Sequence, residues 1–270
     1  MLYLCHMEYI ADEKLYKLRP LLAEFPLDYP IILGILDGTF KGHALADNKD
    51  NPKKALVFHK YIGLLHYMGS PPDEAESVEL ANAALDYRSN RNYCNVVEFA
   101  HYPKRVAQLI EGRLGKIKRY NRISWNHDLT LFNSSPNPET DDSTIVSFIK
   151  KEHFENTFVR LECEMFWESY DVFLEKAFGT IAHDIDGKFM GVCGAVSNSD
   201  GFHEINIETA KEYRRKGIGY AIAHKYIREC YQRGMLPHWD CYDYNEPSQS
   251  LAKKLGFTEA GRYPLISWVY

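Results

Sequence analysis

The chain has 270 residues, of which 45% are hydrophobic, so it can fill the core of one large domain or of two modest ones. Its net charge of −5 argues against a general nucleic-acid surface. The six cysteines form no CxxC pair, which favours reduced thiols and disfavours a metal site. We expect no signal peptide and no membrane helix, because the first residues are not basic and no run approaches ~20 apolar residues. These features predict a soluble, cytoplasmic protein without a nucleic-acid, membrane or metal partner.

In the first half, helices and strands are predicted to alternate. Apolar spacing predicts an amphipathic helix over 15–25, ended by Pro26. Asp37-Gly38 is a strong hairpin signal between apolar runs, and prolines at 72 and 103 mark helix starts. The predicted strands are 31–36, 39–46, 55–67 and 93–100, and the predicted helices after them start at Pro72 and span 103–114.

The second half is predicted to begin near residues 119–125, although no flexible linker marks the boundary. A strand is predicted over 128–132, and helices over 143–152 and 158–178. Asp186-Gly187 predicts a hairpin into a strand over 188–197, and the turn 198–201 leads to an alternating strand over 203–209.

A basic, glycine-spaced turn follows that strand, with the sequence Tyr213-Arg214-Arg215-Lys216-Gly217-Ile218-Gly219-Tyr220. Apolar residues then recur at helical spacing from Ile218 to Cys230, which predicts a helix. Because Gly217 and Gly219 have no Cβ, a ligand can approach the main chain where this helix begins. The free N–H groups and the positive end of the helix dipole suit a pyrophosphate. The alternative is a basic turn in which the glycines are needed only for the backbone conformation and no ligand binds.

The pattern Arg-x-x-Gly-x-Gly in this setting resembles the acyl-CoA signature of the GNAT superfamily of N-acyltransferases. The following strand 237–241, Asn245-x-x-Ser248 and the helix ending Lys254-Leu255-Gly256-Phe257 are similar to the superfamily's second half, in its bacterial antibiotic-resistance-type branch. The resemblance implies acetyl-CoA as co-substrate. It implies cofactor contacts at Ile207, Thr209, Arg214, Arg215, Lys216, Gly217, Ile218, Gly219, Tyr220, Asn245 and Ser248.

The expected fold is therefore α/β, with a GNAT-like mixed, mostly antiparallel sheet and helices on both faces. We assign residues 120–270 to the acyltransferase domain and 1–119 to an N-terminal α/β half. Residues 37–42 and 186–191 share Asp-Gly-x-Phe-x-Gly, and this offset of 149 puts Leu65 opposite Arg214. The first half is thus either a degenerate GNAT-like repeat without a cofactor, or only a chance match between two hairpins. We expect it to serve the acceptor site or a homodimer contact.

The reaction needs a base, because an amine with a pKa near ~10 is mostly protonated at neutral pH. Glu204 lies ten residues before Arg214, in the region where many GNAT enzymes carry a strand glutamate as base. Glu208 shares its strand face by the two-residue period, and either is a candidate catalytic residue. The alternative is that both bind substrate cations or face solvent. His203 is expected on the opposite face in a structural role, unless a bulge reverses it.

The general acid is less clear from the sequence. The superfamily's frequent acid is a tyrosine five residues before the Phe of Gly-Phe, and here that position is Ala252. Ser248, Tyr242 or Tyr244 are substitutes, or the thiolate leaves unassisted. Asn245 and Ser248 also fit helix capping, and both roles can coexist.

The predicted function is transfer of an acetyl group from acetyl-CoA to a primary amine of a small molecule. Three alternatives remain. The acceptor is a protein N-terminus or lysine, the domain is a non-catalytic CoA-binding sensor, or the turn binds another nucleotide.

Overall fold

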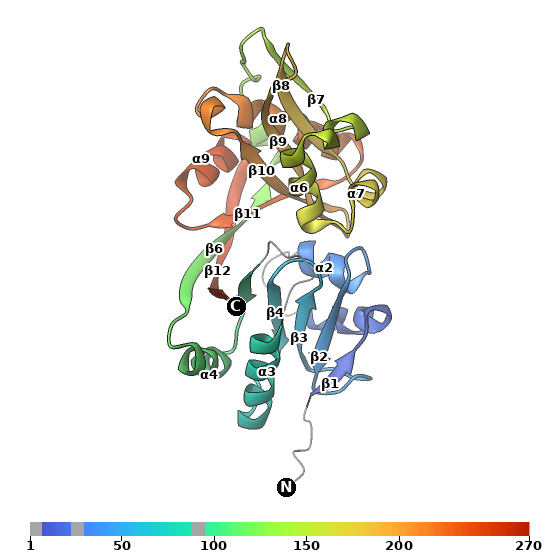
Figure 1. The fold of residues 1–270 in the computed structure, drawn as a ribbon, viewed down its shortest axis with the longest axis vertical. Helices are drawn as coiled ribbons and strands as arrows, with labels where there is room; N and C mark the ends of the chain where they lie inside the picture. Colours follow the sequence, from blue (N-terminus) through green and yellow to red (C-terminus); the bar gives the residue numbers. More distant parts are fainter. Residues whose placement is uncertain (1–6, 23–29, 88–94, 270) are drawn as a thin grey trace. The chain divides into compact units, whose positions relative to one another are not determined.

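The computed structural model describes residues 7–22, 30–87 and 95–269 (Figure 1). Its internal contacts divide the chain into two compact units. Unit 1 comprises residues 1–122 and 262–270, and unit 2 comprises residues 123–261. Both units combine strands with helices, so the predicted α/β class is confirmed.

Unit 1 has a mostly antiparallel sheet. Its strands are β1 (Glu8–Ile10), β2 (Gly42–Ala46), β3 (Lys54–His59), β4 (Leu64–Gly69) and β5 (Val96–Ala100). Its helices are η1 (Asp12–Leu18, a 3₁₀ helix), α1 (Arg19–Leu22), α2 (Pro30–Leu36), α3 (Glu74–Asp86) and α4 (Lys104–Leu114). Neighbouring strands from β1 to β4 are antiparallel, whereas β4 and β5 are parallel, with α3 as the crossover between them. Leu80, Val106 and Ile110 of the two long helices pack into one core with Phe99.

Unit 2 contains the remaining strands and helices. Its strands are β7 (Thr144–Phe148), β8 (Gly179–Asp184), β9 (Phe189–Ser199), β10 (Phe202–Thr209) and β11 (Leu236–Tyr242), with parts of β6 (Lys118–His127) and β12 (Phe257–Val269). Its helices are α5 (Leu129–Asn133), η2 (Lys151–Glu155), α6 (Thr157–Phe166), α7 (Tyr170–Lys176), η3 (Lys211–Tyr213), α8 (Ile218–Gln232) and α9 (Glu246–Lys254). The strands β7 to β10 are antiparallel, and β10 and β11 are parallel, joined by α8. The predicted stripe on α8 is buried from Ile218 to Cys230, which confirms that helix.

Two strands, β6 and β12, contribute residues to both units. The last residues of β12, Leu265–Val269, pair antiparallel with β5, so residues 262–270 belong with unit 1. The predicted division into 1–119 and 120–270 placed this strand with the second half. The structure differs because strand pairing between distant segments leaves no mark in the local sequence.

Two predictions in the first half were wrong. Residues 31–36 belong to helix α2, because a short apolar run suits a buried helix as well as a strand. The predicted strand 55–67 is two antiparallel strands, β3 and β4. Asp37-Gly38 therefore follows a helix, whereas Asp186-Gly187 joins β8 to β9 as predicted. The offset of 149 between the two Asp-Gly motifs is not a structural equivalence, and the topology instead matches β4–α3–β5 to β10–α8–β11.

Other predicted elements differ from those of the structure in type or in length. Residues 129–133 form helix α5 in place of a strand, because the Asp128 side chain accepts hydrogen bonds from the N–H groups of Thr130 and Leu131. The predicted helix 143–152 is mostly strand β7 followed by η2. The predicted helix 158–178 divides into α6 and α7. The helices starting at Pro72 and Pro103 are confirmed as α3 and α4, and residues 23–25 and 93–94 of two predictions lie outside the described residues.

Candidate functional site

The site begins where β10 and β11 stop pairing. The two strands are in parallel register for three residues only, from Phe202 opposite Leu236 to Glu204 opposite His238. Beyond Glu204, β10 remains paired with β9 as far as Thr209, but no register joins it to β11. The side of β10 that faces β11 therefore has no strand partner among the described residues after Glu204. An extended ligand can pair with the main chain there.

Helix α8 starts just after this strand and has an open N-terminus. Gly217 is its N-cap in the left-handed conformation, with φ of 80°, and no side chain caps the helix. The first turn contains no acidic residue, and the N–H groups of Ile218, Gly219 and Tyr220 have no acceptor among the described residues. Three free N–H groups at the positive end of a helix form an anion site.

Close packing fixes the position of this turn. A Cβ on Gly219 would lie 3.2 Å from Thr209 Oγ1 and 3.6 Å from a methyl group of Leu251. The start of α8 thus lies against both the end of β10 and helix α9. The Tyr220 hydroxyl donates a hydrogen bond of 2.7 Å to the Pro136 carbonyl, so the segment after α5 lies along the same turn.

The basic residues before α8 differ in their partners. Arg214 donates hydrogen bonds to the Thr209 carbonyl (3.0 Å) and to the Glu208 carboxylate (2.8 Å). Lys216 lies over the Tyr213 ring, 5.3 Å from its centroid. Arg215 is exposed and has a φ of 62°, which is costly for a residue with a side chain and typical of functional loops. Arg215 and Lys216 are therefore available to a phosphate, whereas Arg214 is bound to β10.

Glu204 is buried at the last paired position of β10, with 9% of its surface exposed. A register shift lies between Glu204 and Ile205, but its extra residue, Val196, is on β9, so β10 keeps its alternation. On the α8 side, His203 Nδ1 makes a 2.8 Å hydrogen bond with the Tyr226 hydroxyl, which fits its expected structural role. Burial lowers the pKa of His203 to about 4. Glu204, Asn206 and Glu208 consequently occupy the opposite face.

One residue of this face was missed by sequence reasoning. His238 of β11 is buried and shares the register position of Glu204. Its Nε2 atom is 3.0 Å from the Ser124 hydroxyl of β6. A single histidine in a strand carries no recognisable motif, and the parallel register that brings it beside Glu204 is known only from the structure.

The candidate acid Ser248 lies at the start of α9. Its hydroxyl accepts a 3.0 Å hydrogen bond from the Trp239 indole N–H, and its own N–H donates to the Asn245 side chain at 3.2 Å. Asn245 therefore caps the helix, as the alternative reading expected. Ala252 is fully buried and offers no hydroxyl, and the rings of Tyr242 and Tyr244 stack with centroids 5.0 Å apart.

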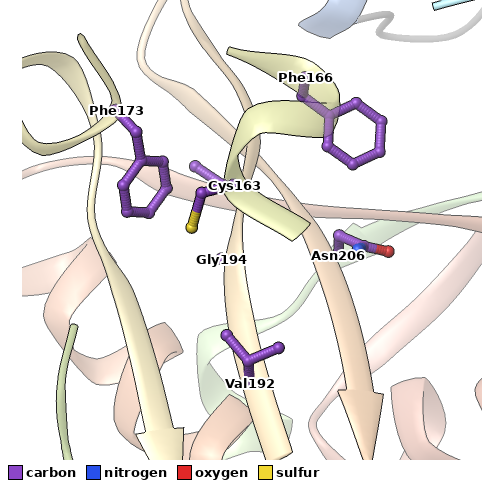
Figure 2. Close-up of a pocket in the computed structure, with 7 residues that line it drawn as sticks. Cys163, Phe166, Phe173, Val192, Gly194 and Asn206 are labelled. Carbon is purple, nitrogen blue, oxygen red and sulfur yellow. The ribbon is translucent and has the colours of Figure 1, made fainter. Parts of the chain in front are cut away.

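An apolar cavity lies on the Asn206 side of the sheet. Figure 2 shows Cys163 and Phe166 of α6 and Phe173 of α7 around the strand that carries Val192 and Gly194, with Asn206 beside it. The Phe173 ring packs on Gly194, because a Cβ there would lie 3.7 Å from it. The cavity measures about 10 Å³, room for roughly one water. Helices α6 and α7 thus cover this face with apolar side chains.

The described residues contain neither a cluster of metal ligands nor a membrane-spanning helix. No cluster of three or more His, Cys, Asp or Glu side chains there could hold a metal ion. None of the helices in the described part of the chain has the length and apolarity to cross a bilayer.

Comparison with solved structures shows the same fold over nearly the whole chain. A GCN5-related N-acetyltransferase-like protein from Streptococcus suis 89/1591 superposes with a TM-score of 0.69, at 20% identity over 95% of this chain and 98% of that one. A GCN5-related N-acetyltransferase from Sphaerobacter thermophilus gives 0.64, at 13% identity over 98% and 96%. A tandem GNAT protein from the clavulanic acid biosynthesis pathway gives 0.61, at 13% identity over 97% and 98%. Identities this low show the fold alone.

Sequence comparison points to the same family. The Bacillus subtilis (strain 168) protein YdfB, described as an N-acetyltransferase, is 33% identical over 103 residues, which is 38% of this chain and 39% of YdfB. The match thus spans less than half of either protein. A model of the GNAT acetyltransferase family matches residues 19–266. The chain therefore belongs to the GNAT acetyltransferase family, which confirms the predicted superfamily and its class of acyltransferase enzymes.

Proposed function

We propose that this protein transfers an acetyl group from acetyl-CoA to the primary amine of a small molecule, in unit 2. The observation that carries the proposal is the start of α8, where three N–H groups without acceptors follow the unpaired edge of β10. An acyl-CoA has a pyrophosphate and an amide-containing arm that match these two features. The three N–H groups have no acceptor among the described residues that would otherwise explain the open helix start.

The residues present fit this co-substrate. The pyrophosphate would take the N–H groups of Ile218, Gly219 and Tyr220, at a position where Gly217 has no side chain. Arg215 and Lys216 add exposed positive charge. The pantetheine arm would pair with the β10 main chain near Ile207 and Thr209, with Asn245 and Ser248 on α9 as additional polar contacts. Arg214 supports Thr209 through its hydrogen bond to that residue's carbonyl.

Glu204 is the favoured base for the acceptor ammonium. It lies at the point where β10 and β11 separate, and it can accept the proton directly or through a water. Glu208 is a weaker candidate, because its carboxylate already pairs with the Arg214 guanidinium at 2.8 Å. His238, at the same register position as Glu204, is a second group that could take or relay this proton.

The transfer itself needs little else from the protein. The amine nitrogen attacks the thioester carbonyl carbon, and main-chain N–H groups on the edge of β10 stabilise the negative oxygen. The C–S bond then breaks, and the departing sulfur takes a proton from Ser248, Tyr242 or Tyr244, or leaves as thiolate. The buried Ala252 in place of the superfamily's tyrosine makes the unassisted route reasonable.

The same substitution favours a second candidate function, a CoA-binding sensor without turnover. Incubating the full chain with acetyl-CoA and a panel of small amines, with thiol release and product mass as readouts, separates the candidates. We expect amine-dependent thiol release and an acetylated small molecule. Release with peptides alone would indicate a protein acceptor, and CoA binding without any release would indicate a sensor. Failure to bind CoA would overturn the proposal.

A further inference from the structure

Unit 1 contains a cavity of about 630 Å³ that the proposed reaction does not use. Its lining residues come from β1, η1, β2, β3 and the C-terminal end of α3. Small-molecule sites typically have volumes of about 300–1,000 Å³, so the cavity can enclose a ligand. No residue of the candidate site in unit 2 lines it.

Stacked rings form one wall of this cavity. The His43 ring lies between Tyr9, with centroids 5.5 Å apart and planes at 28°, and Phe58, at 4.6 Å and 5°. His43 and Phe58 face each other across the β2–β3 ladder, so the strand register fixes the stack. Burial lowers the pKa of His43, which keeps its ring uncharged at neutral pH. Because Tyr9 and Phe58 cover both faces of the His43 ring, the outer face of the exposed Tyr9 ring is the π face that this stack offers to a ligand.

Tyr87 closes the cavity next to this stack. Its ring is 5.6 Å from that of Phe58, and its hydroxyl donates hydrogen bonds to the carbonyls of His59 and Ile62. Tyr87 is also the residue at which α3 ends, and the last turn of that helix has no basic residue. The negative end of the helix dipole thus meets the cavity without a compensating charge.

The charged residues of the lining are mostly acidic. Three carboxylates, Asp12, Glu13 and Asp86, oppose one ammonium, Lys60. Asp12 is fixed by a 2.7 Å hydrogen bond from the Gly42 N–H, and Lys60 lies over the Tyr61 ring at 5.6 Å. Among the described residues, no ion pair or hydrogen bond engages the carboxylates of Glu13 and Asp86. The cavity is therefore negative, and part of that charge has no partner.

We propose that this cavity binds a small organic ammonium ion, with its cation against the Tyr9 ring and near the carboxylates of Glu13 and Asp86. Aromatic faces attract organic cations, and the carboxylates add Coulombic attraction. An anion would be repelled, and a neutral ligand would gain nothing from the carboxylates. A quaternary ammonium probe separates this site from the proposed acetyl transfer, because it has no N–H to be acylated.

A matched pair of probes tests the charge preference. Choline and its uncharged carbon isostere, 3,3-dimethylbutan-1-ol, have nearly the same shape and differ in the cation. In calorimetric titrations of the full chain, choline should bind about tenfold tighter or more, the scale of cation–π and Coulombic contacts together. Equal affinities, or no binding of choline, would overturn the proposal.

Variants at the rim then locate the binding. Glu13→Gln with Asp86→Asn should weaken choline about tenfold and leave the alcohol unchanged, because both changes keep shape and remove charge. Tyr9→Leu, at a side chain that is 61% exposed, should weaken choline about threefold by removing a π face. The control, Glu155→Gln with Glu175→Gln, removes the same charge at exposed positions of unit 2 and should leave choline binding unchanged. Unaltered affinity in both rim variants would place the choline elsewhere and refute the assignment.

Discussion

The crossover β4–α3–β5 of unit 1 and the crossover β10–α8–β11 of unit 2 have the same topology but opposite helix starts. At α3, Asp73 accepts a hydrogen bond from the Glu76 N–H (2.9 Å), and the Glu76 carboxylate accepts one from the Asp73 N–H (2.7 Å). At α8, no side chain caps the helix and no acidic residue lies in the first turn. One helix start is thus occupied by its own carboxylates, and the other is open.

A helix N-terminus can bind an external anion only where the chain leaves its N–H groups without acceptors. The macrodipole is common to both helices, but two carboxylates already use it at α3 and would repel a phosphate. The parallel strand pairs of the two crossovers, β10–β11 and β4–β5, also differ. The third paired position is Glu204 beside His238 in unit 2, and His66 beside Ala100 in unit 1. Of the two crossovers, only β10–α8–β11 therefore combines an open helix start with a carboxylate where the strands separate.

The largest expected effect comes from the carboxylate. Glu204→Gln keeps size and hydrogen bonding but cannot accept a proton, so the chemical step should fall by ~10²–10⁴-fold. CoA affinity should change little, because main-chain groups are proposed to hold the cofactor. The variant should regain activity at high pH, where the free amine is abundant. Single-turnover rates against pH, together with CoA titration, provide the measurement.

Glu208→Gln is the matched control on the same strand face. It removes a half-exposed ion pair with Arg214, which is expected to contribute only about 0–1 kcal/mol to stability. We expect a small loss of rate without a change in pH dependence. If the large loss with recovery at high pH appears in Glu208→Gln and not in Glu204→Gln, the base is Glu208, four residues further along β10.

The second-largest expected effect is a loss of CoA affinity on changing Gly217 at the open start of α8. Gly217→Asp places a carboxylate where the phosphate is expected, and CoA should bind about 100-fold more weakly through charge repulsion. Gly217→Asn is the control, because asparagine has the same shape and tolerates the φ of 80° equally well. Calorimetry of both variants separates charge from strain. Equal losses in the two would assign the effect to the backbone, and unchanged affinity in a folded Asp variant would rule out the phosphate site.

The smallest effect should come from the closed helix start. Asp73→Ala removes the capping box of α3 and should lower the free energy of unfolding by about 1 kcal/mol. CoA affinity should stay the same, since unit 1 is not expected to hold the cofactor. Chemical denaturation and CoA titration of this variant measure both quantities. A gain or loss of CoA affinity would show that the α3 turn takes part in binding.

The glycine-containing turn and the helix after it could be predicted because their signals are local; the cofactor contacts of the turn stay a prediction. Glycine spacing, basic residues and the apolar stripe after Ile218 all lie within one segment, and the structure places that segment between β10 and α8. Glu204 and Asn245 were candidates for the same reason, although their roles stay predictions.

What the sequence did not reveal depends on distant segments or on weak local preference. The pairing of Leu265–Val269 with β5 joins residues far apart in the chain. The register of His238 with Glu204 likewise exists only once the strands assemble. Residues 31–36 were predicted as a strand because an apolar run of six residues does not distinguish strand from helix.

The number of CoA molecules that one chain binds tests the central claim most directly. A calorimetric titration of the full chain should saturate at one equivalent, because, of the two crossover helices α3 and α8, only α8 has an open start. The same titration of Gly217→Asp should show strongly weakened binding, and that of Asp73→Ala should again reach one equivalent with unchanged affinity. Two equivalents of similar affinity per chain, or one equivalent that survives Gly217→Asp unchanged, would contradict the assignment of the cofactor to unit 2.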